Sequence, residues 1–197
     1  TAPNEVTVTT DVEGYSVKYA DGKYYVAANM VKVLDGETEV GTYATLAEAI
    51  AAATAGNTIQ FLADLTEDVT INKDLTIDGN DKNYTGNISV KGSAVDVIVK
   101  NVNFINGTGY AITTNTIKSI TVENCTINDY GYGFLYANRS TPTVVVKNVE
   151  VDNVNYGMHW VYGSNATLEN VTMTNVEYGL CIQNYAAKNI LIKNSNI

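Results

Sequence analysis

Apolar and polar residues alternate in short runs that recur along the chain at a nearly constant interval. The pattern apolar-x-apolar-x-Asn-x-x-apolar is found in "VIVKNVNF", "SITVENCTI", "VVVKNVEV", "ATLENVTM" and "ILIKNSNI". Its five anchor asparagines lie 23, 24, 22 and 24 residues apart: Asn101, Asn124, Asn148, Asn170 and Asn194. The segment "LTIDGN" places Gly79 in the same position 22 residues earlier. Alternating runs predict β-strands, and self-similarity at a period of about 20 to 50 residues predicts a stacked array.

Two apolar positions flank each anchor and predict the buried lining of the array. The residue two before the anchor is apolar in every repeat: Ile77, Val99, Val122, Val146, Leu168 and Ile192. The residue three after the anchor is also apolar: Phe104, Ile127, Val151, Met173 and Ile197. We expect both columns to face inward, because alternate residues of a strand point to opposite faces.

The position immediately before the anchor is charged in every repeat. Its sign alternates without exception: Asp78, Lys100, Glu123, Lys147, Glu169 and Lys193. Opposite charges on neighbouring strands attract, whereas stacked like charges repel. We therefore expect an outward-facing ion ladder that fixes the register of the stack, although each exposed pair contributes only about 0.2–1 kcal/mol.

The anchor asparagines are expected at sharp bends. Asparagine tolerates left-handed backbone geometry, and stacked amides hydrogen-bond from one coil to the next. Glycine accepts the same conformation, which would explain Gly79. Because the repeats lack helical periodicity, each is interpreted as one coil of a parallel β-solenoid with strands roughly 4.8 Å apart. The expected fold class is all-β.

A different pattern precedes the coils, in "TYATLAEAIAAATAGNTIQFL". Thr45 and Glu48 form a capping-box pattern, which predicts a short α-helix within about residues 45–54 that covers the first coil. Residues 1–40 carry short β runs with two Asp-Gly turn signals, and predict a small β element or a linker to a preceding module. The solenoid is expected over residues 41–197. Because the sequence stops inside a repeat, we expect truncation at the C-terminus.

Composition narrows the classes of function. The chain has 197 residues and a net charge of -9, so it would repel a nucleic-acid backbone. No run approaches the ~18 apolar residues of a membrane span, so no membrane insertion is expected. Cys125 and Cys181 match no metal-ligand or redox spacing and are interpreted as small buried residues. No cofactor is expected.

The sequence resembles the right-handed parallel β-helix group that includes pectin and pectate lyases. "YATLAEAIAAA", "GNTIQFLAD" and "VTINKDLTIDG" are similar to the entry of that fold in large, repetitive, secreted or cell-surface bacterial proteins. The resemblance covers roughly residues 41–197. It implies right-handed coils and an extracellular location, but no single activity, because the scaffold serves lyases, hydrolases, adhesins and stalks.

Catalytic signatures of that group are missing from this sequence. Its lyases and polygalacturonases use clustered acids together with Arg or Lys, whereas Arg139 is followed by Ser140 and Thr141. Glu150 and Asp152 could lie within the separation of about 5–10 Å that a two-carboxylate site needs. We interpret them instead as a solvated strand face, and expect neither a catalytic residue nor a metal site.

Tyrosines supply the candidate binding surface. Three follow successive anchors by eight residues and precede a glycine: Tyr132, Tyr156 and Tyr178. Tyr136, Tyr162 and Arg139 lie nearby. Such a row would form a flat surface on which sugar rings stack. The alternative is an aromatic ladder that fills a corner of the coil.

Two further aromatic residues are interpreted as structural. Strand parity places Trp160 in the core. His159 is assigned to the slot that Ile112, Leu135 and Cys181 occupy in other coils, and is expected to be partly buried.

The sequence therefore favours a non-catalytic stalk or adhesin-like scaffold of an exported or cell-surface bacterial protein. A polysaccharide or a host-cell glycan, bound weakly, and other domains of the same longer chain are the expected partners. The alternative is a fragment of a polysaccharide lyase or glycoside hydrolase whose catalytic coils lie beyond Ile197. A third interpretation is self-association through an uncovered last coil.

Overall fold

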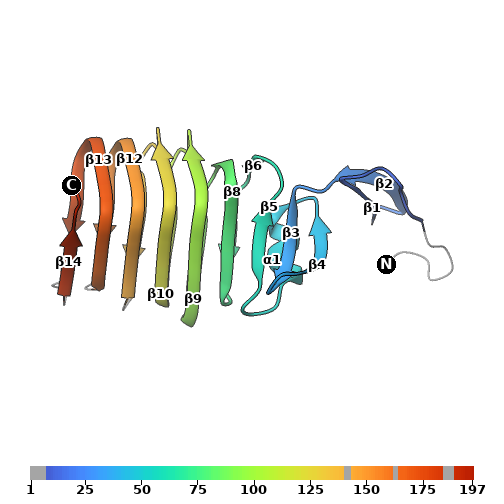
Figure 1. Cartoon of the computed structure of the whole chain (residues 1–197), viewed down its shortest axis with the longest axis horizontal. Helices are drawn as coiled ribbons and strands as arrows, with labels where there is room; N and C mark the ends of the chain where they lie inside the picture. Colours follow the sequence, from blue (N-terminus) through green and yellow to red (C-terminus); the bar gives the residue numbers. More distant parts are fainter. Residues whose placement is uncertain (1–7, 140–142, 162–163, 184–188) are drawn as a thin grey trace.

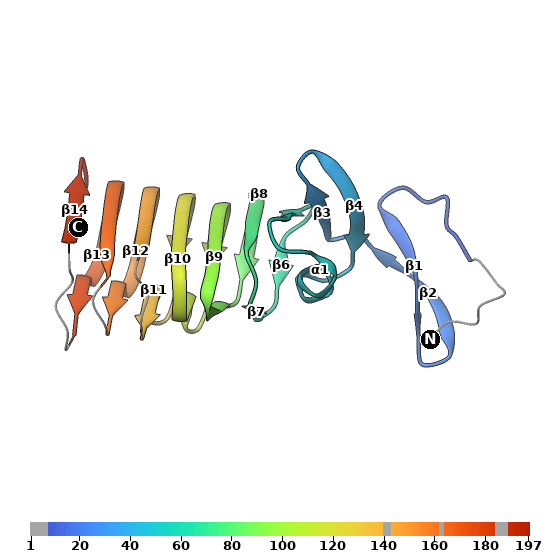
Figure 2. The same ribbon diagram turned by 90° about the horizontal axis from the view of Figure 1, so that it is seen from below.

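A computed structural model describes residues 8–139, 143–161, 164–183 and 189–197. The chain is an all-β solenoid of about 5 turns, with 71% of its residues in strands and 4% in helix, so the expected fold class is confirmed. Coils lie side by side along the long axis, and a β-hairpin projects beyond the N-terminal end (Figures 1 and 2). The elements are β1 (Tyr15–Ala20), β2 (Lys23–Ala28), β3 (Val31–Asp35), β4 (Thr38–Tyr43), α1 (Leu46–Ala52), β5 (Thr58–Phe61), β6 (Leu65–Thr66), β7 (Val69–Ile71), β8 (Leu75–Thr85), β9 (Ile88–Ile105), β10 (Tyr110–Asn128), β11 (Gly133–Asn138), β12 (Thr143–Trp160), β13 (Asn165–Ile182) and β14 (Asn189–Lys193).

Parallel pairing of successive coils builds the stack. The order β5-β8-β9-β10-β11-β12-β13-β14 follows the chain, and β10 also pairs directly with β12. The apolar column before the anchors is in register and fully buried in five coils: Ile77, Val99, Val122, Val146 and Leu168. Both predicted apolar columns line the core, except in the last coil, where Ile192 and Ile197 are 48% and 41% exposed.

The anchor asparagines turn the chain at one corner of each coil. All five have left-handed φ values between 48° and 54°, as the pattern predicts. Asn124, Asn148 and Asn170 each donate from Nδ2 to the Oδ1 of the preceding anchor, over 3.4, 2.9 and 2.9 Å. Asn101 donates to Asp78 Oδ1 over 3.0 Å. The predicted amide ladder is therefore confirmed over four coils.

A second left-handed corner lies five residues after the first, and the sequence pattern did not indicate it. Its members have φ values between 51° and 57°: Asn106, Asp129, Asn153 and Asn175. Their side chains also bond between coils. Asn153 donates to Asp129, and Asn175 donates to Asp152 Oδ1 over 2.8 Å.

Gly79 does not adopt the left-handed conformation expected for it. Asn80 and Asp81, with φ values of 48° and 59°, make that bend instead. A Cβ on Gly79 would lie 2.3 Å from the carbonyl oxygen of Asn101 and 2.6 Å from Cγ2 of Val102. Glycine is therefore required by the close approach of the next coil, rather than by its own φ.

The six alternating charges lie in register on adjacent strands. Among the described residues, only the first step of the ladder closes to an ion pair, with Lys100 Nζ 3.7 Å from Asp78 Oδ2. The expected ladder is confirmed in its register but not as a continuous chain of ion pairs.

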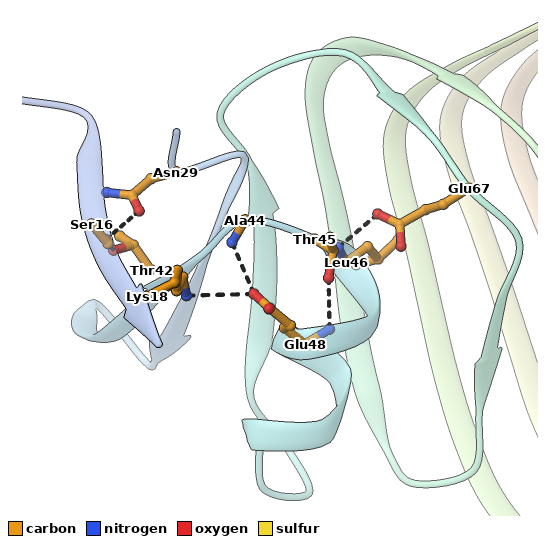
Figure 3. Close-up of polar contacts among 9 residues, drawn as sticks. All are labelled: Ser16, Lys18, Asn29, Thr42, Ala44, Thr45, Leu46, Glu48 and Glu67. Atoms are coloured by element: carbon orange, nitrogen blue, oxygen red, sulfur yellow. Dashed lines mark hydrogen bonds and ion pairs between the residues drawn. The ribbon is translucent and has the colours of Figure 1, made fainter. Parts of the chain in front are cut away.

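The helix α1 covers the N-terminal end of the stack, with Leu46 buried in the core. The predicted capping box forms only in part. Glu48 N–H donates to Thr45 Oγ1 over 3.1 Å, as expected, but the Glu48 carboxylate accepts the N–H of Ala44, one residue before the N-cap, over 3.1 Å (Figure 3). The carboxylate of Glu67, from the coil beneath, accepts the N–H of Leu46 over 2.7 Å. Negative charge at a helix N-terminus is favourable, because free N–H groups point toward it.

The same coil also holds the other end of α1. The Lys73 ammonium group donates to the carbonyl oxygens of Ile50 and Ala53, over 2.9 and 2.8 Å. Lys73 is half-buried and satisfies two carbonyl groups that the helix itself leaves unpaired. No helix among the described residues is long and apolar enough to cross a membrane.

Two hairpins precede the coils. β3 pairs antiparallel with both β4 and β5, so Val31–Tyr43 belongs to the solenoid sheet, and the part of residues 1–40 that stands apart is the β1–β2 hairpin. This hairpin contacts the cap through Lys18, whose Nζ lies 3.4 Å from Glu48 Oε2 (Figure 3). A hydrogen bond from Ser16 to Asn29 closes the base of the hairpin.

Inside the first coils, four aromatic rings stack along the axis. Phe61, Tyr84, Phe104 and Tyr130 have successive centroid distances of 5.8, 5.7 and 6.1 Å, and each is at most 2% exposed. The buried hydroxyls are bonded, because Tyr84 donates to the Glu67 carbonyl over 2.6 Å and Tyr130 to the Gly86 carbonyl over 2.9 Å.

Candidate functional site

Five tyrosines and one histidine gather on the outer face of the coils formed by β10 to β13. We call this group the tyrosine patch: Tyr110, Tyr132, Tyr136, Tyr156, His159 and Tyr178. Tyr132 and Tyr178 are 57% and 48% exposed, and the other members are half-buried. The patch therefore faces solvent, while Trp160, as predicted from strand parity, is fully buried in the core.

Strand register places the tyrosines differently from their spacing in the sequence. Tyr156 pairs with Tyr178, as expected, but the partner of Tyr156 on the preceding coil is Gly133, which in turn pairs with Tyr110. Tyr132 lies one residue before this column, in the turn that precedes β11. Tyr110, which follows a glycine instead of preceding one and so does not fit the Tyr-Gly pattern, is thus the first member of the column.

His159 also occupies a slot other than the one assigned to it. It pairs with Tyr136 on one side and Cys181 on the other, whereas Leu135 pairs with Met158. The assignment of His159 to the Leu135 slot was wrong by one residue, because the two coils differ in length before this strand. The expectation that His159 is partly buried is confirmed. Cys181 is half-buried rather than fully buried, unlike Cys125.

The glycine in the tyrosine column leaves space that the Tyr110 ring uses. A Cβ on Gly133 would lie 3.0 Å from Cε1 of Tyr110 and 2.1 Å from the carbonyl oxygen of Tyr156. Tyr110 stacks on Tyr136 with a centroid distance of 5.0 Å, and its hydroxyl lies 3.0 Å from Nδ1 of His159. One side chain thereby connects three coils.

Several ring pairs of the patch lie nearly parallel, whereas Tyr136 and His159 are tilted by 58°. Tyr156 and Tyr178 have a centroid distance of 5.1 Å and an interplanar angle of 17°, and Tyr156 and His159 have 5.1 Å and 21°. Rings packed in this way cover much of one another's faces, so the patch presents ring edges and hydroxyls, together with the open parts of Tyr132 and Tyr178. The patch therefore differs from the expected flat row of open ring faces.

Two hydroxyls of the patch, those of Tyr110 and Tyr178, have a raised pKa and remain protonated at neutral pH. Burial, with a smaller effect from the neighbouring Tyr156, raises the pKa of Tyr110 to about 12. A hydrogen bond with Glu177 raises the pKa of Tyr178. The patch therefore combines apolar ring carbon with hydroxyl groups, which suits ligands that combine C–H and O–H groups.

The remaining candidate residues lie at the margin of the patch or outside the described chain. Arg139 is exposed at the end of β11, with φ of 69°, and makes no ion pair or ring contact with a described residue. Tyr162 lies outside the described residues. Ring contacts therefore bring together four of the six predicted residues: Tyr132, Tyr136, Tyr156 and Tyr178.

The two acids considered for hydrolysis have different surroundings. Asp152 accepts hydrogen bonds from Thr174 and Asn175, which lower its pKa. Glu150 is exposed and borders a groove lined by Asn124, Asn148 and other side chains of the first corner. No group of three or more His, Cys, Asp or Glu residues in the described chain is arranged to hold a metal ion.

A second exposed aromatic group was missed because it lies outside the repeats. The β1–β2 hairpin exposes Tyr15, Tyr24 and Tyr25 by 47%, 36% and 49%, and the ring centroids of Tyr19 and Tyr24 are 4.9 Å apart. The tyrosines of the two short β runs "YSVKYA" and "KYYVAA" were the available signal.

Comparison of the chain with protein-family models, with curated proteins and with solved structures finds no match in any of the three.

Proposed function

We propose that this chain is a rigid, non-catalytic β-solenoid module of an exported or cell-surface bacterial protein, related to the pectin and pectate lyase-like parallel β-helix group. The capping helix followed by coils of constant register supports that relationship, as does the resemblance of the entry segment. Corner asparagines, apolar columns and internal aromatic rings explain most residues as parts of a stiff spacer.

The module binds carbohydrate weakly through the tyrosine patch. The observation that carries this proposal is the half-exposed cluster of stacked rings on an outer face, held by strands at every member except Tyr132. Sugars present C–H groups that pack on aromatic carbon and hydroxyls that bond to phenol groups. Because the patch extends along the stack, the bound glycan chain runs along the solenoid axis. We expect dissociation constants near about 1 mM.

Calorimetric titration with plant, mucin and bacterial glycans tests the proposal. Tryptophan emission is a poor readout, because Trp160 is fully buried. We expect saturable binding by at least one glycan, and a loss of tenfold or more in affinity in Tyr156→Ala and Tyr178→Ala. Tyr25→Ala removes a comparably exposed ring from the hairpin and serves as the matched control. Absence of saturable binding, or equal affinity in all three variants, would contradict the proposal.

A further inference from the structure

One outer face of the solenoid has a charge order that is complementary to its own reverse. We call it the ladder face, formed by the outward positions of six parallel segments: 74–78, 96–100, 119–123, 143–147, 165–169 and 189–193. Three columns run across it. The first is the alternating charge ladder that begins at Asp78 and ends at Lys193.

The other two columns are also ordered along the stack. The middle column alternates threonine with an apolar residue: Thr76, Ile98, Thr121, Val145, Thr167 and Leu191. The third column has acids at one end and amides at the other: Asp74, Asp96, Ser119, Thr143, Asn165 and Asn189. In all three columns, therefore, the residue type changes from one end of the stack to the other.

The charge ladder and the middle column are largely unpaired within the chain, whereas the third column is bonded, since Asp96 contacts Lys118 and Ser119 and Asn189 donates to Asn165. Of the five steps of the charge ladder, all of which join described residues, only Asp78 to Lys100 closes to an ion pair. Ile98 and Leu191 are 39% and 48% exposed in the middle column. Charges and apolar groups that the fold does not use within the chain are therefore presented together on one side of the sheet.

The alternation has a consequence for a second copy of the chain. If two ladder faces meet about a two-fold axis parallel to the strands, each column lies opposite itself and the order of the coils is reversed. Because the ladder has an even number of alternating charges, every acid then faces a lysine. The three kinds of pair are Asp78 with Lys193, Lys100 with Glu169, and Glu123 with Lys147 of the second copy.

The other two columns match under the same operation. Each threonine of the middle column faces an apolar residue, as Thr121 faces Val145, and the acids of the third column face amides, as Asp74 faces Asn189. A two-fold axis along the solenoid instead keeps each coil opposite itself. If that axis lies over the charge ladder, each charge faces the same charge of the second copy. If it lies over the middle column, Asp78 faces Asp74 of the second copy.

We propose that the chain forms an antiparallel homodimer through the ladder face. The face measures six strands by about five residues, which is roughly 500 Å² on each copy at strand spacings of about 4.8 and 3.3 Å. This area is below the roughly 800 Å² per partner of standard interfaces, so the dimer is a weak one, with a dissociation constant on the order of 0.1 mM. Added salt weakens it, because its specificity is electrostatic.

Sedimentation velocity over a range of protein concentrations tests the dimer. Glu123→Lys sets Lys147 of each copy against a lysine of the other, and Lys147→Glu sets two acids together; each variant is expected to weaken dimerisation tenfold or more. An equimolar mixture of the two variants restores a full set of opposite charges between unlike chains. We expect the mixture to regain the dimer, which also shows that both variants are folded.

The double variant Glu123→Lys with Lys147→Glu separates contacts between copies from contacts within the stack. It places like charges beside each other along the ladder but keeps opposite charges across the two-fold axis, so dimerisation should return to the wild-type level. Glu150→Lys, an exposed site beyond the asparagine corner, is the control and should change nothing. Three outcomes would overturn the proposal. The wild-type chain could stay monomeric, or the mixture of the two single variants could stay monomeric. Association could also survive both single variants, as stacking through the last coil would.

Discussion

The hydroxyl of Tyr110 lies 3.0 Å from Nδ1 of His159, although an entire coil separates the two residues. The contact exists because the intervening position of the tyrosine column is Gly133. With no side chain there, the Tyr110 ring spans the gap and stacks on Tyr136. Three coils are thereby joined by side chains as well as by strand pairing, and the patch is a single packed unit.

Gly133→Ala should destabilise the fold. Its added Cβ would lie 2.1 Å from the backbone carbonyl oxygen of Tyr156, which cannot move without disturbing the strand. Overpacking of this kind costs about 1–3 kcal/mol in the free energy of unfolding, measurable by chemical denaturation. Gly109→Ala is the matched control, since a Cβ there meets nothing within 4 Å. Equal stability of the two variants would show that Gly133 is not needed for close packing.

The first corner of each coil could be predicted from the sequence, and the tyrosine column could not. Residues near an anchor such as Asn124 keep a constant spacing in the coils that have an anchor asparagine, because strand register and the amide ladder both depend on it. Beyond the second corner the coils differ. Gly133 follows Asp129 at the fourth position, whereas Tyr156 follows Asn153 at the third.

The extra residue has a structural use that spacing alone does not reveal. In the longer turn, Tyr130 is buried in the core and its ring packs against Gly107. A Cβ on Gly107 would lie only 2.1 Å from that ring. Counting from the anchor therefore places Tyr132, instead of Gly133, opposite Tyr156. The charge ladder shows a second limit of prediction from sequence. The repeat pattern indicates which charged residues are neighbours on adjacent strands, but not whether their side chains form ion pairs.

The anchor asparagines should be replaceable by glycine at lower cost than by alanine. Asn148 has φ of 51° and takes part in two ladder hydrogen bonds. Asn148→Gly removes the bonds but keeps the backbone freedom, whereas Asn148→Ala adds about 1–2 kcal/mol for left-handed geometry. Urea denaturation of both variants measures the difference. Asn155→Ala, at an exposed position without left-handed φ, provides the control. A glycine variant less stable than the alanine variant would contradict this account.

Lys73→Met should loosen the cap more than the coils. It leaves the Ile50 and Ala53 carbonyl oxygens without the lysine donor, and a hydrogen bond from a charged group is worth about 1.5–3 kcal/mol. Native-state hydrogen exchange should quicken in α1 and remain unchanged in β12 and β13. Lys91→Met changes an exposed lysine that has no hydrogen bond or ion pair with a described residue and should leave the cap as it is. Faster exchange throughout the stack would mean that α1 is not a separate opening unit.

Buried tyrosines should make the fold lose stability in alkaline solution. Burial raises the pKa of Tyr130 and of Tyr110 to about 12, and also raises the pKa of Tyr84. Each folded-state value exceeds the value of about 10 in an unfolded chain, so the folded state holds more protons at high pH. The resulting stability is fully present below about pH 10 and is lost as the pH rises through about 12.

Tyr130→Phe should therefore reduce the slope of unfolding free energy against pH between about 10 and 12, by at most about 1.4 kcal/mol per pH unit for one proton. The variant also loses the hydrogen bond to the Gly86 carbonyl, which lowers stability at every pH and leaves the slope untouched. Val146→Ala, a core change that keeps all tyrosines, should lower stability with the wild-type slope. Denaturation series at several pH values distinguish the two effects, and an unchanged slope in Tyr130→Phe would show that this phenol is not a source of the alkaline sensitivity.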